Sequence, residues 1–344
     1  MRFVSFVILT LSTVAFAEKT DPVAKKPVVK DDFADLTNDP LLGKADRIGG
    51  TEMKGVVAFT FDDGPDANTT PAVIDACEKY DIPATFFIVT RRIVGKHGAK
   101  PREILARMVK GGFQIASHSV THPNLRTAST KVMSSEIDNS IKVLSKEIAR
   151  PIAMFRPPFG AIDNRGRGWL KKRGLTEVQW SVDTLDWQAK NAEKLRKKVF
   201  KMIVAQEGGV VLMHDVKPIT AKIVASVFDD LEAENCARLA DKKEPIVPVS
   251  IHYFLRDKKQ PRAIPADVKK RTDAYRAALP ARCAKRPKPV EPPPDAAKAA
   301  KPDAAKPDAK PEAAKPAAKP EATKPDSAKP AAKPDPTKPE AAKP

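Results

Sequence analysis

The 344-residue sequence is poor in cysteine and in long apolar runs, and it lacks one common hydrolase signature. Its three cysteines allow at most one disulfide within the chain. After the first 17 residues no apolar stretch has the length of a membrane span, so no membrane-spanning segment is expected. No Gly-x-Ser-x-Gly turn is present, which removes the nucleophile signature of a serine esterase.

The three cysteines differ in their surroundings. Cys77 lies in the helix-like stretch PAVIDACEKY, whose apolar spacing buries it as an inert core thiol. Cys236 and Cys283 lie on either side of the end of the predicted folded region. We expect these two to pair in an oxidising compartment.

The opening residues MRFVSFVILTLSTVAFAEKT predict a secretory signal peptide, residues 1–17. Arg2 supplies a basic start, and the apolar run from Phe3 to Phe16 is too short to span a bilayer stably. Ala15 and Ala17 flank Phe16 as a small-x-small cleavage site, and no cysteine follows that would carry a lipid anchor. We therefore expect export to the periplasm or the exterior.

Residues 285–344 have a different composition, with 16 of the 33 prolines, no aromatic residue and an irregular Ala-Ala-Lys-Pro-Asp/Glu repeat. Such a segment has nothing to bury, so the sequence predicts a disordered tail with polyproline-II character. The tail has 14 basic and nine acidic side chains, within a chain of net charge +18. Because export argues against a nucleic-acid partner, we expect a spacer or a contact with anionic envelope polymers.

Residues 18–52 are rich in Lys, Asp and Pro and are predicted to be a linker. Residues 53–257 remain as the folded domain, followed by a C-terminal extension over 258–284. We expect a monomer. Strand-like runs alternate with helical stretches throughout the domain, which predicts parallel strands joined by crossover helices. The strand-like runs are GVVAFTF, ATFFIV, GFQIASH, MFRPPFG, EVQWSVD, GVVLMHD and PVSIHYF.

Seven such units in about 200 residues predict an α/β fold, a distorted (β/α) barrel of about seven strands. In these barrels the chemistry lies at the carboxyl ends of the strands. Four of the five histidines fall at or near the predicted strand–loop junctions, and His97 lies in a loop. The polar residues that follow the runs are Asp62, Asp63, His118, Arg156, Asp186 and His214.

The stretch TFDDGP places Asp62 and Asp63 side by side after a buried strand, where two carboxylates need a partner. In SHSVTHPNL, His118 and His122 have a four-residue spacing that puts both rings on one face of a helical turn. With Asp63 they form a two-His, one-carboxylate set that suits zinc and, by ligand type alone, also iron. The second carboxylate favours metal-assisted hydrolysis over an oxygenase, because Asp62 can take a proton from water.

Five stretches, in order, resemble the motifs of the polysaccharide deacetylase family, the NodB-homology group known as carbohydrate esterase family four. They are TFDDGP, SHSVTHPNL, RPPFG, DTLDW and VLMHD, and the resemblance covers roughly residues 53–257. It implies a distorted (β/α) barrel that removes N-acetyl, and in some members O-acetyl, groups from polymeric sugars.

The resemblance also implies a role for each matching residue. Asp62 matches the general base, and Arg156 the arginine that orients it. Asp63, His118 and His122 match the ligands of a divalent metal, zinc above all, with cobalt or another ion as an alternative. His214 matches the general acid that protonates the leaving amine, and Asp186 the carboxylate that bonds to this imidazole. Phe159, often Tyr in the family, matches an oxyanion-stabilising main-chain position, and Trp187 and Leu212 match apolar walls, although core packing explains both equally well.

The substrate stays open at this stage. Peptidoglycan N-acetylglucosamine leads, because its peptides are anionic and an exported protein meets it. Chitin, poly-N-acetylglucosamine and acetylated xylan are the alternatives. A wall-binding protein without turnover is the rival from another class, and Asp183 is assigned as a structural acid.

Overall fold

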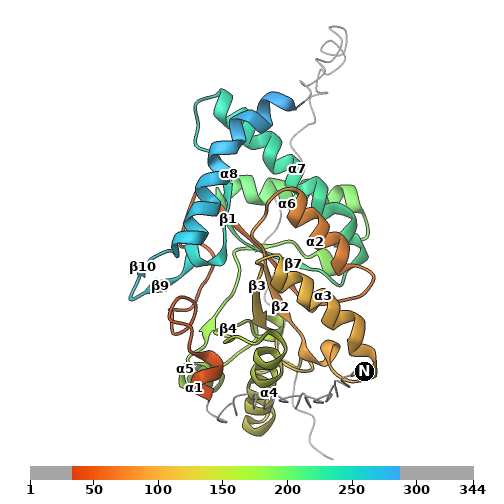
Figure 1. Cartoon of the computed structure of the whole chain (residues 1–344), viewed down its shortest axis with the longest axis vertical. Helices are drawn as coiled ribbons and strands as arrows, with labels where there is room; N and C mark the ends of the chain where they lie inside the picture. Colours follow the sequence, from red (N-terminus) through yellow and green to blue (C-terminus); the bar gives the residue numbers. More distant parts are fainter. Residues whose placement is uncertain (1–32, 287–344) are drawn as a thin grey trace, which may run out of the picture. The chain divides into compact units, whose positions relative to one another are not determined.

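Seven parallel strands form a curled sheet in the order β5-β4-β3-β2-β1-β7-β6 within the computed structural model, which describes residues 33–286 (Figure 1). A short further strand, β8, pairs with the first residues of β1, whereas β2 pairs with its last residues. The strands are β1 Val56–Asp62, β2 Thr85–Ile88, β3 Gln114–Ser117, β4 Met154–Phe155, β5 Thr176–Glu177, β6 Val182–Asp183, β7 Gly208–His214 and β8 Val247–Pro248.

The sheet is not closed, because β5 and β6, its two edge strands, do not pair with each other in the described part of the chain. This arrangement confirms the predicted distorted α/β barrel. Most of the helices cover the outer face of the sheet (Figure 1). A small antiparallel pair, β9 (Arg256–Asp257) with β10 (Gln260–Pro261), is separate from the sheet. The helices are α1 Phe33–Thr37, α2 Thr70–Lys79, α3 Ala99–Lys110, α4 Thr130–Ile148, α5 Asn164–Lys172, α6 Ala192–Ala205, α7 Pro218–Ala240 and α8 Ala266–Lys285.

Several helices begin at residues whose side chains cap free backbone amides. Ser129 caps α4 by accepting a hydrogen bond from Val132 N, Asp163 caps α5, and Asn191 caps α6. A proline lies in the first turn of α2 and of α7, where its missing amide proton costs no helical hydrogen bond. Ser, Asp, Asn and Pro are residue types that favour helix starts.

Alternation along the strands divides the core into two clusters. On β1, Val57, Phe59 and Phe61 pack toward the helices, whereas Val56 and Ala58 belong to the second cluster, inside the barrel. Successive side chains of a strand point to opposite faces. The inner face of β1 therefore continues from Ala58 through Thr60 to Asp62, which brings a carboxylate into the mouth of the barrel.

Two of the strands predicted from the sequence are shorter or interrupted in the structure. The run 177–183 is split into β5 and β6, because the carbonyl oxygens of Val178 and Gln179 accept hydrogen bonds from Arg156 instead of from a neighbouring strand. The run 248–254 is a strand only at its start. Its second half, Ile251–Phe254, turns into a 3₁₀ helix, with Tyr253 N donating to Ser250 O.

The predicted linker needs a correction from residue 33 onward. Leu42 and Ile48 are buried in the inner core cluster, and Ile48 forms a parallel bridge with Val178. The apolar residues of this segment are few but complete the barrel where its sheet is open. The C-terminal extension also packs on the domain, because Tyr275 and Leu279 of α8 are buried in the same cluster.

A disulfide joins Cys236 of α7 to Cys283 of α8, with 5.4 Å between their Cα atoms, which confirms the predicted pairing. Cys77 is a buried free thiol, also as predicted. The predicted signal peptide, residues 18–32 of the predicted linker and residues 287–344 of the Lys-Pro tail lie outside the described residues. Among the helices of residues 33–286, none has the length and apolarity needed to cross a membrane.

Candidate active site

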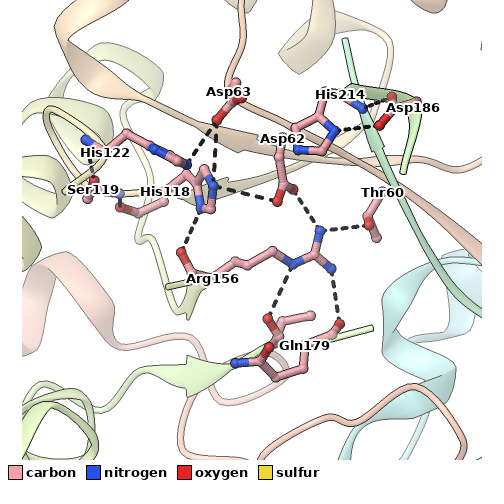
Figure 2. Close-up of polar contacts among 12 residues, drawn as sticks. Thr60, Asp62, Asp63, His118, Ser119, His122, Arg156, Gln179, Asp186 and His214 are labelled. Carbon is pink, nitrogen blue, oxygen red and sulfur yellow. Dashed lines mark hydrogen bonds and ion pairs between the residues drawn. The ribbon is translucent and has the colours of Figure 1, made fainter. Parts of the chain in front are cut away.

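The polar residues predicted to gather at the strand ends do so by strand alternation. Val210 of β7 and Met154 of β4 belong to the inner core cluster, so His214 and Arg156, at even spacings from them, share that face. The register between β1 and β7 places Asp62 directly beside His214. Figure 2 shows these side chains converging with Asp63, His118 and His122.

Asp62 and Arg156 form a buried ion pair beneath the mouth of the barrel. Nη1 of Arg156 donates to Oδ1 of Asp62 at 2.7 Å and to Oγ1 of Thr60 at 2.8 Å. The guanidinium lies 4.0 Å from the ring centroid of Phe87, and its side chain is fully buried. Burial raises the pKa of Asp62, while the charge of Arg156 works in the opposite direction. The Asp62 carboxylate is thus held in one orientation by Arg156.

Asp63, His118 and His122 offer three ligand atoms that all lie within 4.8 Å of one another. Oδ1 of Asp63 is 3.3 Å from Nε2 of His122 and 3.7 Å from Nε2 of His118. The expected helical turn is absent, because β3 ends at Ser117 and His122 has a positive φ of 66°. Instead, a loop closed by hydrogen bonds from its amides to Glu136 carries the pair of histidines.

These three residues fit a divalent metal ion on two grounds. Oδ1 of Asp63 is buried and has no hydrogen-bond partner, an arrangement that a cation would relieve. Nδ1 of His118 lies 2.7 Å from the carbonyl oxygen of Arg156, which only accepts, so this nitrogen carries the proton and Nε2 keeps its lone pair. Burial lowers the pKa of His118 to about 3, which leaves the ring neutral, as a metal ligand must be.

His214 and Asp186 form the second polar pair of the site. Nδ1 of His214 lies 2.7 Å from Oδ1 of Asp186, and the His214 amide donates to Oδ2 at the same distance. Thr220, in the first turn of α7, also donates to Oδ2. Although burial acts in the other direction, the bond and charge of Asp186 raise the pKa of His214 to about 9. The ring is therefore protonated at neutral pH, with Nε2 free to donate.

A pocket of about 320 Å³ opens over these groups. Of the three predicted substrate contacts, Leu212 forms a buried wall, whereas Phe159 and Trp187 are 67% and 54% exposed at the rim. The Phe159 ring lies 4.6 Å from that of His122. All ten predicted site residues are thus in or directly beneath this region, and Asp183 and Trp180 line it as well.

Sequence reasoning missed several residues that hold the site in place. Thr60 supports Arg156, and Glu136 closes the histidine loop; only Thr60 was traceable, from its shared strand face with Asp62. Asp215 is fully buried with its Oδ2 accepting from Thr70, and Gly64 packs so closely that a Cβ there would lie 1.9 Å from that oxygen. His252, the remaining histidine near a strand end, does not line the pocket, and its Nδ1 contacts the Ser250 hydroxyl.

Comparison with known proteins agrees with this geometry. A family model for polysaccharide deacetylases matches residues 49–178. A chitooligosaccharide deacetylase of Bradyrhizobium sp. is 32% identical over 184 residues, which cover 52% of this chain and 79% of that protein. The chain belongs to the polysaccharide deacetylase family, carbohydrate esterase family four.

Other relatives are longer. The peptidoglycan-N-acetylglucosamine deacetylase PgdA of Listeria monocytogenes is 32% identical over 217 residues, 62% of this chain but 44% of the relative, so the chain spans less than half of it. Among solved structures, a mutant of BA3943, described as a pseudoenzyme of the CE4 family, superposes with a TM-score of 0.50 and 23% identity. The match covers 56% of this chain and 68% of the other, and it concerns the fold.

Proposed function

We propose that the protein is an exported, metal-dependent deacetylase that hydrolyses N-acetyl groups of an amino-sugar polymer, with peptidoglycan N-acetylglucosamine as the leading substrate. The observation that carries the proposal is the convergence of three sets in one pocket. These are the Asp62–Arg156 pair, the Asp63, His118 and His122 set, and the His214–Asp186 pair. Amide hydrolysis needs a base to deprotonate water, a Lewis acid to polarise the carbonyl group and an acid to protonate the leaving nitrogen. The pocket offers one candidate for each.

Asp63, His118 and His122 would hold the metal ion. Bound there, a divalent ion such as zinc supplies Lewis-acid chemistry, by polarising a carbonyl oxygen and acidifying water. The expected alternatives are cobalt or another divalent ion. The orphaned carboxylate oxygen of Asp63 and the free lone pair of His118 Nε2 support this assignment.

The protein's own groups would then move two protons. Oδ2 of Asp62, the oxygen not bonded to Arg156, takes a proton from a water molecule. The water oxygen bonds to the carbonyl carbon as it loses this proton. Arg156 keeps this carboxylate in position throughout. The main-chain N–H of Phe159 is the candidate donor to the oxyanion. Nε2 of His214, protonated because Nδ1 is held by Asp186, donates to the leaving nitrogen, and acetate and a free amine result.

The named relatives support an N-acetylated glycan but differ in substrate. Listeria monocytogenes PgdA is named for peptidoglycan N-acetylglucosamine, and the Bradyrhizobium protein for chitooligosaccharides. Chitin, poly-N-acetylglucosamine and acetylated xylan therefore remain the alternative substrates. A non-catalytic wall-binding protein is disfavoured, because every catalytic position is filled.

The test is incubation of the zinc-loaded protein with solubilised peptidoglycan fragments and with N-acetylchitooligosaccharides, followed by mass spectrometry. We expect loss of one acetyl unit from a fragment, abolished by chelation and restored by Zn²⁺. Binding of fragments without any acetate release would favour the wall-binding protein. Full turnover in protein shown by elemental analysis to be metal-free would overturn the mechanism.

A further inference from the structure

The catalytic pocket continues into two shallow hollows lined by lysines. The first, of about 490 Å³, is lined by Lys190, Lys217 and Lys222 together with Trp187. The second, of about 420 Å³, shares Lys190 and adds Lys194 and Lys198, and the Lys198 ammonium donates to the carbonyl oxygen of Thr184. Trp187 and Lys217 also line the catalytic pocket itself. The hollows are therefore an extension of the site rather than a separate surface. We call Lys190, Lys194, Lys217 and Lys222 the lysine subsite.

The charge of the lysine subsite is not neutralised within the described part of the chain. None of its four ammonium groups has a carboxylate within ion-pair distance. By contrast, Lys197, which is on helix α6 with Lys194, pairs with Glu193 at 3.4 Å. Asp186 is the sole acid lining either hollow, and it is buried and bonded to His214 and Thr220. Lys190, Lys194 and Lys222 are exposed, so their charges face the space beside the pocket.

Two helix starts add to this positive surface. α6 begins at Ala192, between Lys190 and Lys194, and α7 begins at Pro218, directly after Lys217. The amide ends of helices carry partial positive charge, which favours an anion close to the first turn. α6 and α7 lie side by side (Figure 1), so both starts reinforce the lysines.

We infer that the lysine subsite binds carboxylates on the sugar units next to the one that is deacetylated, which makes an acidic amino-sugar polymer the preferred substrate. This inference rests on the proposed function. Trp187, more than half exposed between the pocket and the lysines, offers a flat apolar face for a sugar ring. A glycan that crosses this ring brings its substituents over the ammonium groups. Peptidoglycan carries free carboxylates on the stem peptides attached to its sugar units, whereas the sugar units of chitin and the acetylated xylose units of xylan carry no charge.

The experiment compares solubilised peptidoglycan fragments with the same fragments after amidation of their carboxylates, so that only charge differs. For the full-length, zinc-loaded protein, kcat/KM is measured by acetate release and the affinity by calorimetry. Each quantity is expressed as a ratio, its value for the acidic fragment divided by its value for the amidated fragment. We expect Lys190→Gln/Lys194→Gln/Lys222→Gln to lower both ratios roughly five- to twentyfold, as expected for a few exposed charges acting together. Added salt should reduce the ratios of the unmodified protein, because screening is strong beyond about 8–10 Å at moderate ionic strength.

The matched control is Lys110→Gln/Lys146→Gln/Lys242→Gln. These lysines lie at or just after the last turns of α3, α4 and α7, which return the chain to the opposite end of the strands. The three control substitutions remove the same net charge as those in the subsite variant, and we expect both ratios to stay unchanged. Equal loss in the two triple variants would overturn the inference in favour of the overall charge of the protein, and an unchanged ratio in the subsite variant would overturn it outright. Absence of turnover on every fragment contradicts the proposed function, whereas the calorimetric ratios still test the subsite.

Discussion

The carboxylates of Asp62 and Asp63, adjacent in the chain, both lie near Nε2 of His118 but differ in their shortest contacts. Oδ1 of Asp62 accepts a hydrogen bond of 2.7 Å from Arg156, whereas Oδ1 of Asp63 lies 3.3 Å from Nε2 of His122 and has no hydrogen-bond donor. Strand alternation turns Asp62 inward, and the positive φ of Asp63, 79°, ends the strand and turns its side chain toward the histidine loop. Two neighbouring residues can therefore hold two separate roles.

The first prediction separates these roles. Asp62→Asn keeps the size of the side chain and an acceptor for Arg156 but cannot take a proton, so metal should stay bound while turnover falls by about 10²–10⁴-fold. Asp63→Ala removes a ligand, so both metal content and turnover should fall. Elemental analysis and acetate release measure the two effects on the same samples.

Asp66→Asn is the matched control for both variants. Asp66 follows in the same loop but does not line the pocket, and an asparagine retains the acceptor that Asn68 N uses. We expect metal content and turnover close to those of the unmodified protein. If Asp62→Asn loses its metal and Asp63→Ala retains it, the two assignments are reversed.

The second prediction concerns Gly64, the residue after Asp63. A Cβ on Gly64 would lie 1.9 Å from Oδ2 of Asp215, a fully buried side chain bonded to Thr70. Gly64→Ala should therefore displace the loop that carries Asp63 and weaken zinc binding in a titration, at a cost of about 1–3 kcal/mol in the free energy of unfolding. Gly168→Ala is the control, because beyond the local helix backbone a Cβ on that glycine would meet no atom within 4 Å. Unchanged zinc affinity in Gly64→Ala would contradict the positioning role of this contact.

Much of the barrel and of its site was predictable from local pattern. Two-residue alternation sets the faces of β1 and β7, and parallel strands bring their carboxyl ends together, so Asp62 and His214 follow from the sequence. The break between β5 and β6 does not follow from it. The run EVQWSVD alternates well, and its interruption depends on two carbonyls that bond to Arg156, a residue more than 20 positions away.

The histidine loop and the N-terminal segment illustrate the same limit. A four-residue spacing of His118 and His122 fits a helical turn, but the loop is shaped by Glu136, which local sequence does not connect to it. Residues 33–52 appear as a linker because their apolar residues are sparse. Leu42 and Ile48 are buried only because the sheet is open where they pack, and that opening is a tertiary feature.

The third prediction concerns the disulfide between Cys236 and Cys283. It closes a loop of 47 residues from α7 to α8, and neither cysteine lines the catalytic pocket. Replacing both by serine should lower the free energy of unfolding by about 2–4 kcal/mol, measured by denaturant titration, while turnover under native conditions is retained. Reductant should destabilise the unmodified protein and leave the double variant unaffected. Equal sensitivity of both proteins to reductant would contradict the prediction.

The last prediction is the pH dependence set by His214. Its pKa is raised to about 9, so the imidazolium that donates the proton is present below this value and is lost as pH rises through it. Turnover should therefore fall on the alkaline side. A bound cation opposes the negative charge of Asp63, which helps to raise the pKa of His214. The alkaline limb of the zinc-loaded enzyme should therefore lie at a lower pH than the His214 ring titration that NMR measures in the metal-free protein.

Asp186→Asn tests the cause of this shift. It removes the carboxylate that raises the pKa of His214, so both the ring titration and the alkaline limb should move to lower pH. Thr220→Val is the control, because it removes only a hydroxyl that donates to Asp186 and leaves the charge in place, and neither curve should move downward. The raised pKa of His214 also increases the free energy of unfolding at low pH. This contribution is complete below the ordinary histidine pKa of about 6.5 and disappears as pH rises through about 9. A ring titration near 6.5 in the unmodified metal-free protein would show that Asp186 does not hold the proton on His214.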